Sequence, residues 1–198
     1  MILKQEWNHN FEMTNLGLMK YFLGIEVTQS GDGIFIFQSK YAKDILKRFR
    51  MENCKLVINP IAIGTKLSKN DQGSKVDPTL YKKWVGSLMY FTATMCDIMF
   101  VVSLISRFMQ SPNSTHWMVG KNILRYVSGT RNYGIFYTYG LDFKLIGYTY
   151  SDFAWNIDDM KSTYGYMFNF GPIAVSWTSK KKSIVTLSSA EVEYVAST

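Results

Sequence analysis

The sequence predicts an α+β fold from three observations. Two β-prone runs flank turn residues near the N-terminus, and apolar residues recur at helical spacing through the middle of the chain. From about residue 137 the pattern changes to strands. With 47% hydrophobic and 16% aromatic residues among 198, the chain can bury a core, which excludes a disordered tail.

The first predicted elements are a β-hairpin and a helix. Tyr21–Val27 and Ile34–Phe37 are β-prone, and the run Ser30–Gly33 between them has turn chemistry. A helix is predicted over 41–50, because its apolar residues share one face. The other face carries Lys40, Lys43, Lys47 and Arg48. Two interpretations of that face stay open: an ordinary solvated surface, or a strip that faces phosphates.

Three more helices follow a predicted loop over 59–78. The first begins at Asp77-Pro78, with the aspartate as N-cap. The second runs over 97–110 and stops before Pro112, and the third is capped by Ser114 and ends before Gly129. In the first of these helices the spacing predicts burial of Leu80, Trp84, Val85 and Leu88.

The C-terminal region predicts three strands and the start of a helix. The strands cover 143–152, 162–169 and 174–187, the last with a bend at Lys180–Lys182. Ser188 and Glu191 have the spacing of a capping box, which predicts a helix that reaches the last residue. Such a domain would be incomplete, with a sheet that lacks part of its helical cover.

The net charge, the cysteines and the histidines indicate what kind of partner and compartment to expect. A net charge of +7 favours a polyanionic partner such as nucleic acid, although it also fits many other soluble proteins. Cys54 and Cys96 form no Cys-x-x-Cys pair, which predicts reduced thiols in the cytoplasm or nucleus. His9 and His116 have no partner at metal-ligand spacing and are expected to be ordinary surface or helix residues.

Neither a signal peptide nor a membrane span is predicted. The first six residues lack a basic start followed by an apolar run. The apolar stretch 86–105 carries Asp97 at its middle, where a carboxylate would be costly inside a bilayer. Two helices that meet at Asp97 explain this stretch better.

Ordered blocks along the whole chain resemble the Pol polyprotein of copia-type long-terminal-repeat retrotransposons. The blocks are Phe11–Gly17, Tyr21–Val27, Val85–Tyr90, Ser106–Met109, Leu124–Tyr126, Gly129-Thr130, Tyr133–Ile135, Lys161–Thr163, Ser176-Trp177 and Leu187–Tyr194. The resemblance implies the end of a reverse-transcriptase palm with a primer-grip-like hairpin over 1–60, and a helical thumb and connection over 61–138. It implies a truncated ribonuclease H-like domain over 139–198, which begins with an antiparallel sheet.

The resemblance also implies nucleic acid as partner, either a primer–template or an RNA–DNA hybrid. The hairpin around Phe22, Leu23 and Gly24 is similar to the family's primer grip, and glycine permits close backbone approach to a ligand. Basic side chains supply the other expected contacts. These are Lys43, Lys47, Arg48, Arg107, Lys121, Arg125 and Lys181.

The catalytic carboxylates of the family are largely missing. Its polymerase motif, Tyr-x-Asp-Asp, does not occur in this chain, and Asp158-Asp159 is expected to be structural. In the ribonuclease strand Tyr150 replaces the first aspartate, while Asp152 and Glu191 are the carboxylates that match the family. Asp152 lies roughly 6.6 Å further along the strand, so it is a poor substitute ligand for Mg²⁺. The third aspartate would lie beyond Thr198.

The sequence therefore predicts a Pol fragment that binds nucleic acid without catalysis. The parent family uses Mg²⁺ for DNA polymerisation on RNA and for hybrid cleavage, and this chain is expected to bind no metal. Changes such as Trp155 and Asn156, in place of a glycine and an aspartate, suggest a decayed copy. Two alternatives remain open: a longer active product of the same reading frame, and a domesticated non-catalytic nucleic-acid-binding protein.

Overall fold

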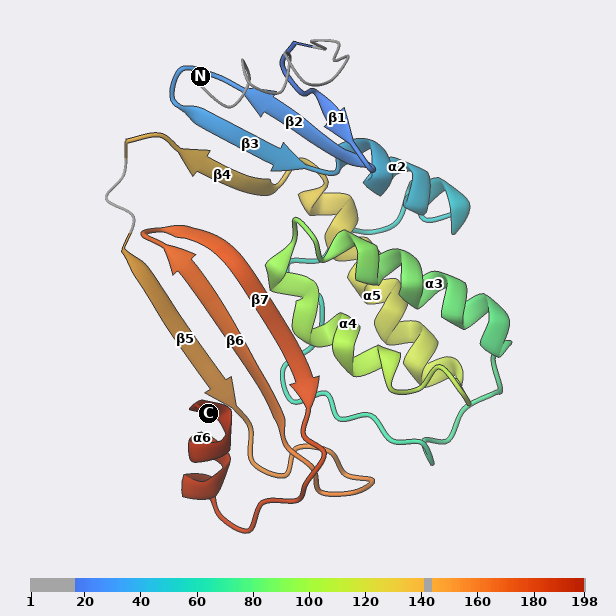
Figure 1. Ribbon diagram of the computed structural model, residues 1–198. Helices are drawn as coiled ribbons and strands as arrows, with labels where there is room; N and C mark the ends of the chain where they lie inside the picture. Colours follow the sequence, from blue (N-terminus) through green and yellow to red (C-terminus); the bar gives the residue numbers. More distant parts are fainter. Residues whose placement is uncertain (1–16, 141–143, 198) are drawn as a thin grey trace, which may run out of the picture.

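The computed structural model describes residues 17–140 and 144–197 (Figure 1). His9, the block over 11–16 and the expected start of a strand at Phe143 lie outside the described residues. The fold combines helices with two antiparallel sheets, which confirms the α+β class. Among the described residues, no helix has both the length and the apolar character needed to cross a bilayer.

The first sheet has the order β1-β2-β3-β4. Its strands are β1 (Tyr21–Phe22), β2 (Ile25–Gln29), β3 (Gly33–Phe37) and β4 (Gly134–Thr138). The predicted strand Tyr21–Val27 is therefore wrong as one unit, because the chain turns at Leu23-Gly24. Both turn residues have positive φ, 46° and 81°, as a tight type I′ hairpin turn requires.

Strand β4 was not predicted, because its partner β3 lies far earlier in the chain and no hairpin turn joins the two. Phe35 faces Phe136 in this pair. Glycines permit the close approach: a Cβ atom on Gly134 would lie 2.1 Å from the Ile36 carbonyl oxygen. The C-terminal end of the predicted 61–138 segment thus belongs to the first sheet and not to the helices.

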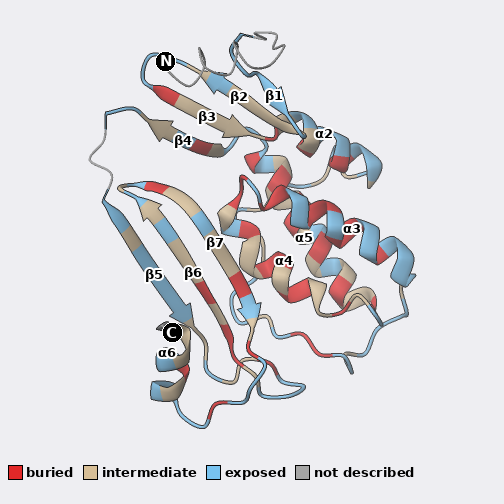
Figure 2. Cartoon of the chain, viewed as in Figure 1, coloured by how far each residue is buried: buried red, intermediate tan, exposed pale blue. Residues whose placement is uncertain are grey.

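The helices hold most of the buried core, which Figure 2 shows in red. They are α2 (Ser39–Arg48), α3 (Pro78–Phe91), the 3₁₀ turn η1 (Cys96–Ile98), α4 (Met99–Ser106) and α5 (Ser114–Thr130). Asp77 caps α3 as predicted, since its carboxylate accepts a hydrogen bond from the Thr79 amide at 2.9 Å. Between α2 and α3 the chain forms a long loop, also as predicted.

Three details of the helices differ from the predictions. Leu80 is 43% exposed, because the buried face of α3 passes through Tyr81, Trp84 and Val85 instead. Helix α4 ends at Ser106 rather than near 110. The N-cap of α5 is Asn113, not Ser114: its Oδ1 atom accepts from the amides of Thr115 and His116.

The second sheet has the order β5-β6-β7 and comprises β5 (Leu145–Ser151), β6 (Thr163–Phe170) and β7 (Ile173–Lys181). Strand β7 ends at Lys181, short of the predicted 187, and a loop leads to α6 (Ser189–Ser197). Helix α4 packs on β7, and α6 packs on β5 (Figure 1).

Polar contacts join the second sheet to the helices. Ser103 Oγ donates to the Ser179 carbonyl at 2.8 Å, and Trp177 Nε1 donates to the Thr92 carbonyl at 3.0 Å. These bonds fix the sheet beside α4, so the two parts of the chain form one packed structure.

Candidate functional site

The β1–β2 hairpin presents an apolar tip to solvent. Tyr21, Phe22 and Leu23 are 55%, 57% and 72% exposed. The turn itself rests on α3: a Cβ atom on Gly24 would lie 3.0 Å from the Tyr90 hydroxyl oxygen. Glycine thus serves both the positive φ and the close approach: the turn contacts Tyr90 at Gly24, while the neighbouring Leu23 side chain stays accessible.

Basic side chains line the outward face of α2 next to this hairpin. Lys43, Lys47 and Arg48 are exposed, and none forms an ion pair with a described residue, although Asp44 lies among them. Lys40 links the helix to the hairpin, since its Nζ atom lies 5.5 Å from the centre of the Tyr21 ring. Lys121 on α5 is also exposed and without an ion pair in the described chain.

Two of the predicted contacts are already engaged within the fold. Arg107 is partly buried and donates to Thr163 Oγ1 at 2.9 Å, and burial lowers the pKa of its guanidinium group. Lys181 pairs with Asp159 at 2.6 Å. Partial burial acts to raise the pKa of Asp159, but the hydrogen bond and charge of Lys181 outweigh it and lower that pKa.

Tyr150, which the resemblance places where an aspartate is expected, braces the second sheet. Its hydroxyl donates to Ser179 Oγ at 2.7 Å, so the side chain spans from β5 to β7. Its ring lies over Gly165, where an added Cβ would be 2.2 Å from Tyr150 Cε1. Burial raises the pKa of this phenol, which keeps it protonated and unsuited to bind Mg²⁺.

Asp152 and Glu191, the two carboxylates predicted from the resemblance, close local turns. Asp152 Oδ1 accepts from the Thr163 amide at 2.7 Å. Glu191 Oε2 accepts from the Leu187 amide at 2.7 Å, and the Glu191 amide donates to Ser188 Oγ at 3.1 Å. Within the described part of the chain, no three His, Cys, Asp or Glu side chains group closely enough to hold a metal ion. In this arrangement Asp152 and Glu191 do not fit the magnesium site that the resemblance implies.

Asp158 and Asp159 connect the loop between β5 and β6 to other segments. Asp158 accepts hydrogen bonds from the Ser68 hydroxyl and, at 3.0 Å, from the Lys69 amide. Asp159 holds Lys181, as above. Both carboxylates therefore have partners that explain them structurally, as the sequence suggested for this pair.

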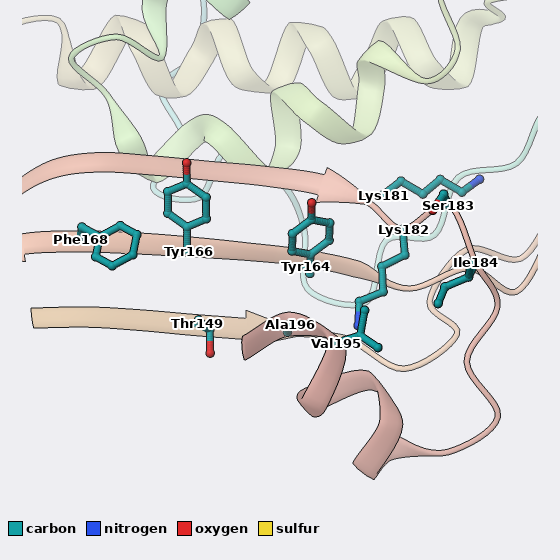
Figure 3. Close-up of a pocket in the computed structure, with 10 residues that line it drawn as sticks. All are labelled: Thr149, Tyr164, Tyr166, Phe168, Lys181, Lys182, Ser183, Ile184, Val195 and Ala196. Carbon is teal, nitrogen blue, oxygen red and sulfur yellow. The ribbon is translucent and has the colours of Figure 1, made fainter. Parts of the chain in front are cut away.

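A cavity of about 720 Å³ lies between α6 and the second sheet (Figure 3). Aromatic side chains of β6 line one wall, among them Tyr164 and Tyr166. Lys182 crosses toward α6 and is only 4% exposed, and its Nζ atom donates to the Val192 carbonyl at 2.6 Å. Sequence reasoning missed this role, because a third consecutive lysine gave no signal of burial.

His116 is a helix residue, as expected, but it is fully buried. Its Nδ1 atom accepts from the Asn113 amide at 3.2 Å, so the proton sits on Nε2, which lies 3.0 Å from the Ser68 carbonyl oxygen. Burial lowers the pKa of His116, although the Ser68 carbonyl and the Asp71 carboxylate act to raise it. The imidazole thus has a structural role and lacks metal-ligating partners among the described residues.

Comparisons with known proteins place the chain in a family. A family model described as reverse transcriptase (RNA-dependent DNA polymerase) matches residues 2–63. The chain is 41% identical over 176 residues to the Pol polyprotein from transposon RE1 of Arabidopsis thaliana. It is 38% identical over 205 residues to the Pol polyprotein from transposon TNT 1-94 of Nicotiana tabacum.

These matches cover 89% and 99% of the chain but 12% and 15% of the two polyproteins. An uncharacterized mitochondrial protein of Arabidopsis thaliana is 33% identical over 187 residues, which are 94% of this chain and 77% of that protein. No solved structure matches the chain. The chain therefore belongs to the Pol polyprotein family of copia-type retrotransposons, and residues 2–63 match its reverse transcriptase.

Proposed function

We propose that this chain is a part of a Pol polyprotein, and that it binds the phosphate backbone of a nucleic acid without cutting it. The observation that carries the proposal is the row of exposed cations on α2, beside the exposed β1–β2 hairpin, that form no ion pair with any described residue. Uncompensated lysine and arginine side chains bind phosphates and release counterions, with little preference for sequence.

The proposed roles of the three segments of the chain follow those of the family. Residues 1–60 supply the primer-grip-like hairpin, residues 61–138 the helical thumb and connection, and residues 139–198 a ribonuclease H-like part. Lys43, Lys47, Arg48, Lys121 and Arg125 contact phosphates, whereas Arg107 and Lys181 serve the fold. The ligand is a primer–template or an RNA–DNA hybrid, met in the cytoplasm or nucleus.

The whole polyprotein would polymerise DNA on RNA and cleave the hybrid with Mg²⁺. In this chain the ribonuclease H-like part lacks the first carboxylate, because Tyr150 stands there and uses its hydroxyl to brace the sheet. Two metal ions need several oxygen ligands close together. The carboxylates of Asp152 and Glu191 each already accept a hydrogen bond from a backbone amide.

The proposal is tested with a labelled RNA–DNA hybrid in the presence of Mg²⁺. We expect the chain to retain the hybrid on a filter and to leave the RNA strand intact. Cleavage that requires Mg²⁺ and is abolished by Glu191→Gln would contradict the inert site. The Glu191→Gln control also excludes a contaminating nuclease, because such an activity would survive the substitution.

A further inference from the structure

A basic hollow lies where α2 ends and α5 passes beneath the following loop. Its volume is about 500 Å³. Four cations line it, Arg50, Lys55, Lys121 and Arg125, and Glu52 is the one acidic residue among the lining side chains. Only Lys121 and Arg125 were among the contacts expected from the sequence; Arg50 is the last residue of the predicted helix over 41–50, and Lys55 lies beyond it.

The charges of this hollow are not balanced within the described chain. None of the four cations forms an ion pair there, and Glu52 forms none either. The Arg125 Nε atom is buried and has no hydrogen-bond acceptor among the described residues. Like charges gathered around one space repel each other, and a buried guanidinium nitrogen without an acceptor is unfavourable, so both features point to an anion as the occupant.

Arg50 lines this hollow with its backbone in a strained conformation. Arg50 has φ of 56°, in the left-handed region that favours glycine. It occupies the residue after the C-cap of α2: its amide donates to the Lys47 carbonyl, and the Met51 amide donates to the Leu46 carbonyl, as in a Schellman motif. An arginine at a position where glycine is favoured is the kind of strain that accompanies a functional site.

We propose that Arg50, Lys55, Lys121 and Arg125 form a phosphate-binding site for one backbone phosphate of a bound nucleic acid. The inference rests on the proposed function and names a specific site within it. A nucleic acid is favoured over a free anion because Lys43 and Lys47 continue the positive charge along α2, away from the hollow. At a rise of 1.5 Å per residue, the stretch from Lys43 to Arg50 spans roughly 10 Å, which consecutive phosphates of one strand can follow.

The test is a titration of a short fluorescein-labelled RNA–DNA hybrid with four forms of the chain, followed by anisotropy. We expect Arg50→Gly to weaken binding about tenfold at low salt and to reduce the slope of log affinity against log salt by about 1. Arg50→Lys keeps the charge and should keep the slope. Lys82→Gln, which removes an exposed charge on α3, should leave the affinity unchanged.

Arg50→Gly also separates binding from folding. Glycine adopts positive φ without strain, so the variant should unfold at the same or a higher urea concentration than the wild type. If the wild type binds with a steep salt slope and Arg50→Gly binds equally well, the phosphate-binding site is refuted while the proposed function stands. If wild type does not bind at all, both fail.

Two further measurements locate the ligand. Cys54 lines the hollow, so bound hybrid should slow its alkylation, whereas Cys96, which lines a different cavity, should react at an unchanged rate. Equal alkylation of Cys54 with and without hybrid would overturn the proposal. Inorganic phosphate, added at constant ionic strength, tests whether the bound phosphate group comes from a nucleic acid or is a free anion. Saturable protection of Cys54 by phosphate without protection by hybrid would assign the phosphate-binding site to a free anion instead.

Discussion

The Tyr150 side chain makes a contact that a carboxylate at the same position could not make in the same way. A protonated phenol donates to Ser179, and its ring covers Gly165 on the neighbouring strand. An aspartate is too short to span from β5 to β7, so it could not form this cross-strand brace. The sequence alone did not predict this brace, because it depends on the register of three strands.

The residue with the clearest pH dependence is His116. Its pKa in the folded chain is lowered by burial, whereas in the unfolded chain it should be near 6.5. The folded state therefore binds the proton more weakly, and stability that is fully present above pH about 6.5 is lost as the pH falls toward the folded pKa. Protonation would also turn Nδ1 into a donor that faces the Asn113 amide.

Urea unfolding of the wild type and of His116→Gln, at several values between about pH 8 and pH 5, measures this effect. We expect the variant to be less stable than the wild type at pH 8, by about 1–3 kcal/mol for a lost buried hydrogen bond. The difference should shrink as the pH falls. A difference that stays constant or widens toward acid would contradict a neutral, buried His116.

At the scale of elements, local signals were predictable and long-range pairing was not. The cap at Asp77, the basic face of α2 and the cap at Ser188 follow from residues within a few positions of each other. Strand β4 depends on a partner from the other end of the chain, and no local pattern marks it. The basic hollow has the same origin, because tertiary packing brings α5 to the end of α2.

The β1–β2 hairpin gives a prediction at this scale. Leu23 has φ of 46°, which costs a branched L-residue about 1–2 kcal/mol. Asn-Gly is the favoured pair for a type I′ turn, and Leu23 is 72% exposed, so Leu23→Asn loses little burial.

We expect Leu23→Asn to raise the free energy of unfolding by about 0.5–1 kcal/mol, measured by urea denaturation. Leu23→Val, which places a β-branched side chain at the same positive φ, is the matched control and should lower it. If Leu23→Asn destabilises the chain, the turn is not of the type that its backbone angles indicate.

At the scale of the whole molecule, the core and the candidate contacts occupy different places. The buried apolar residues lie mainly among α2, α3, α4 and α5, while the unpaired cations lie on the outer face of α2 and in the hollow beside it. The second sheet is fixed to the helices by polar contacts and contributes few fully buried apolar side chains. Charges on the outer face can therefore be removed without opening the core.

The central claim is that these cations bind nucleic acid through its phosphates, and the dependence of hybrid affinity on salt tests it most directly. The measurement compares the wild type with Lys43→Gln/Lys47→Gln/Arg48→Gln and with the matched control Lys69→Gln/Lys82→Gln/Lys83→Gln, which removes the same charge elsewhere. We expect a steep negative slope for the wild type and the control, and a slope reduced by about 3 in the α2 variant. A wild-type slope near zero, or equal losses in the two triple variants, would contradict it.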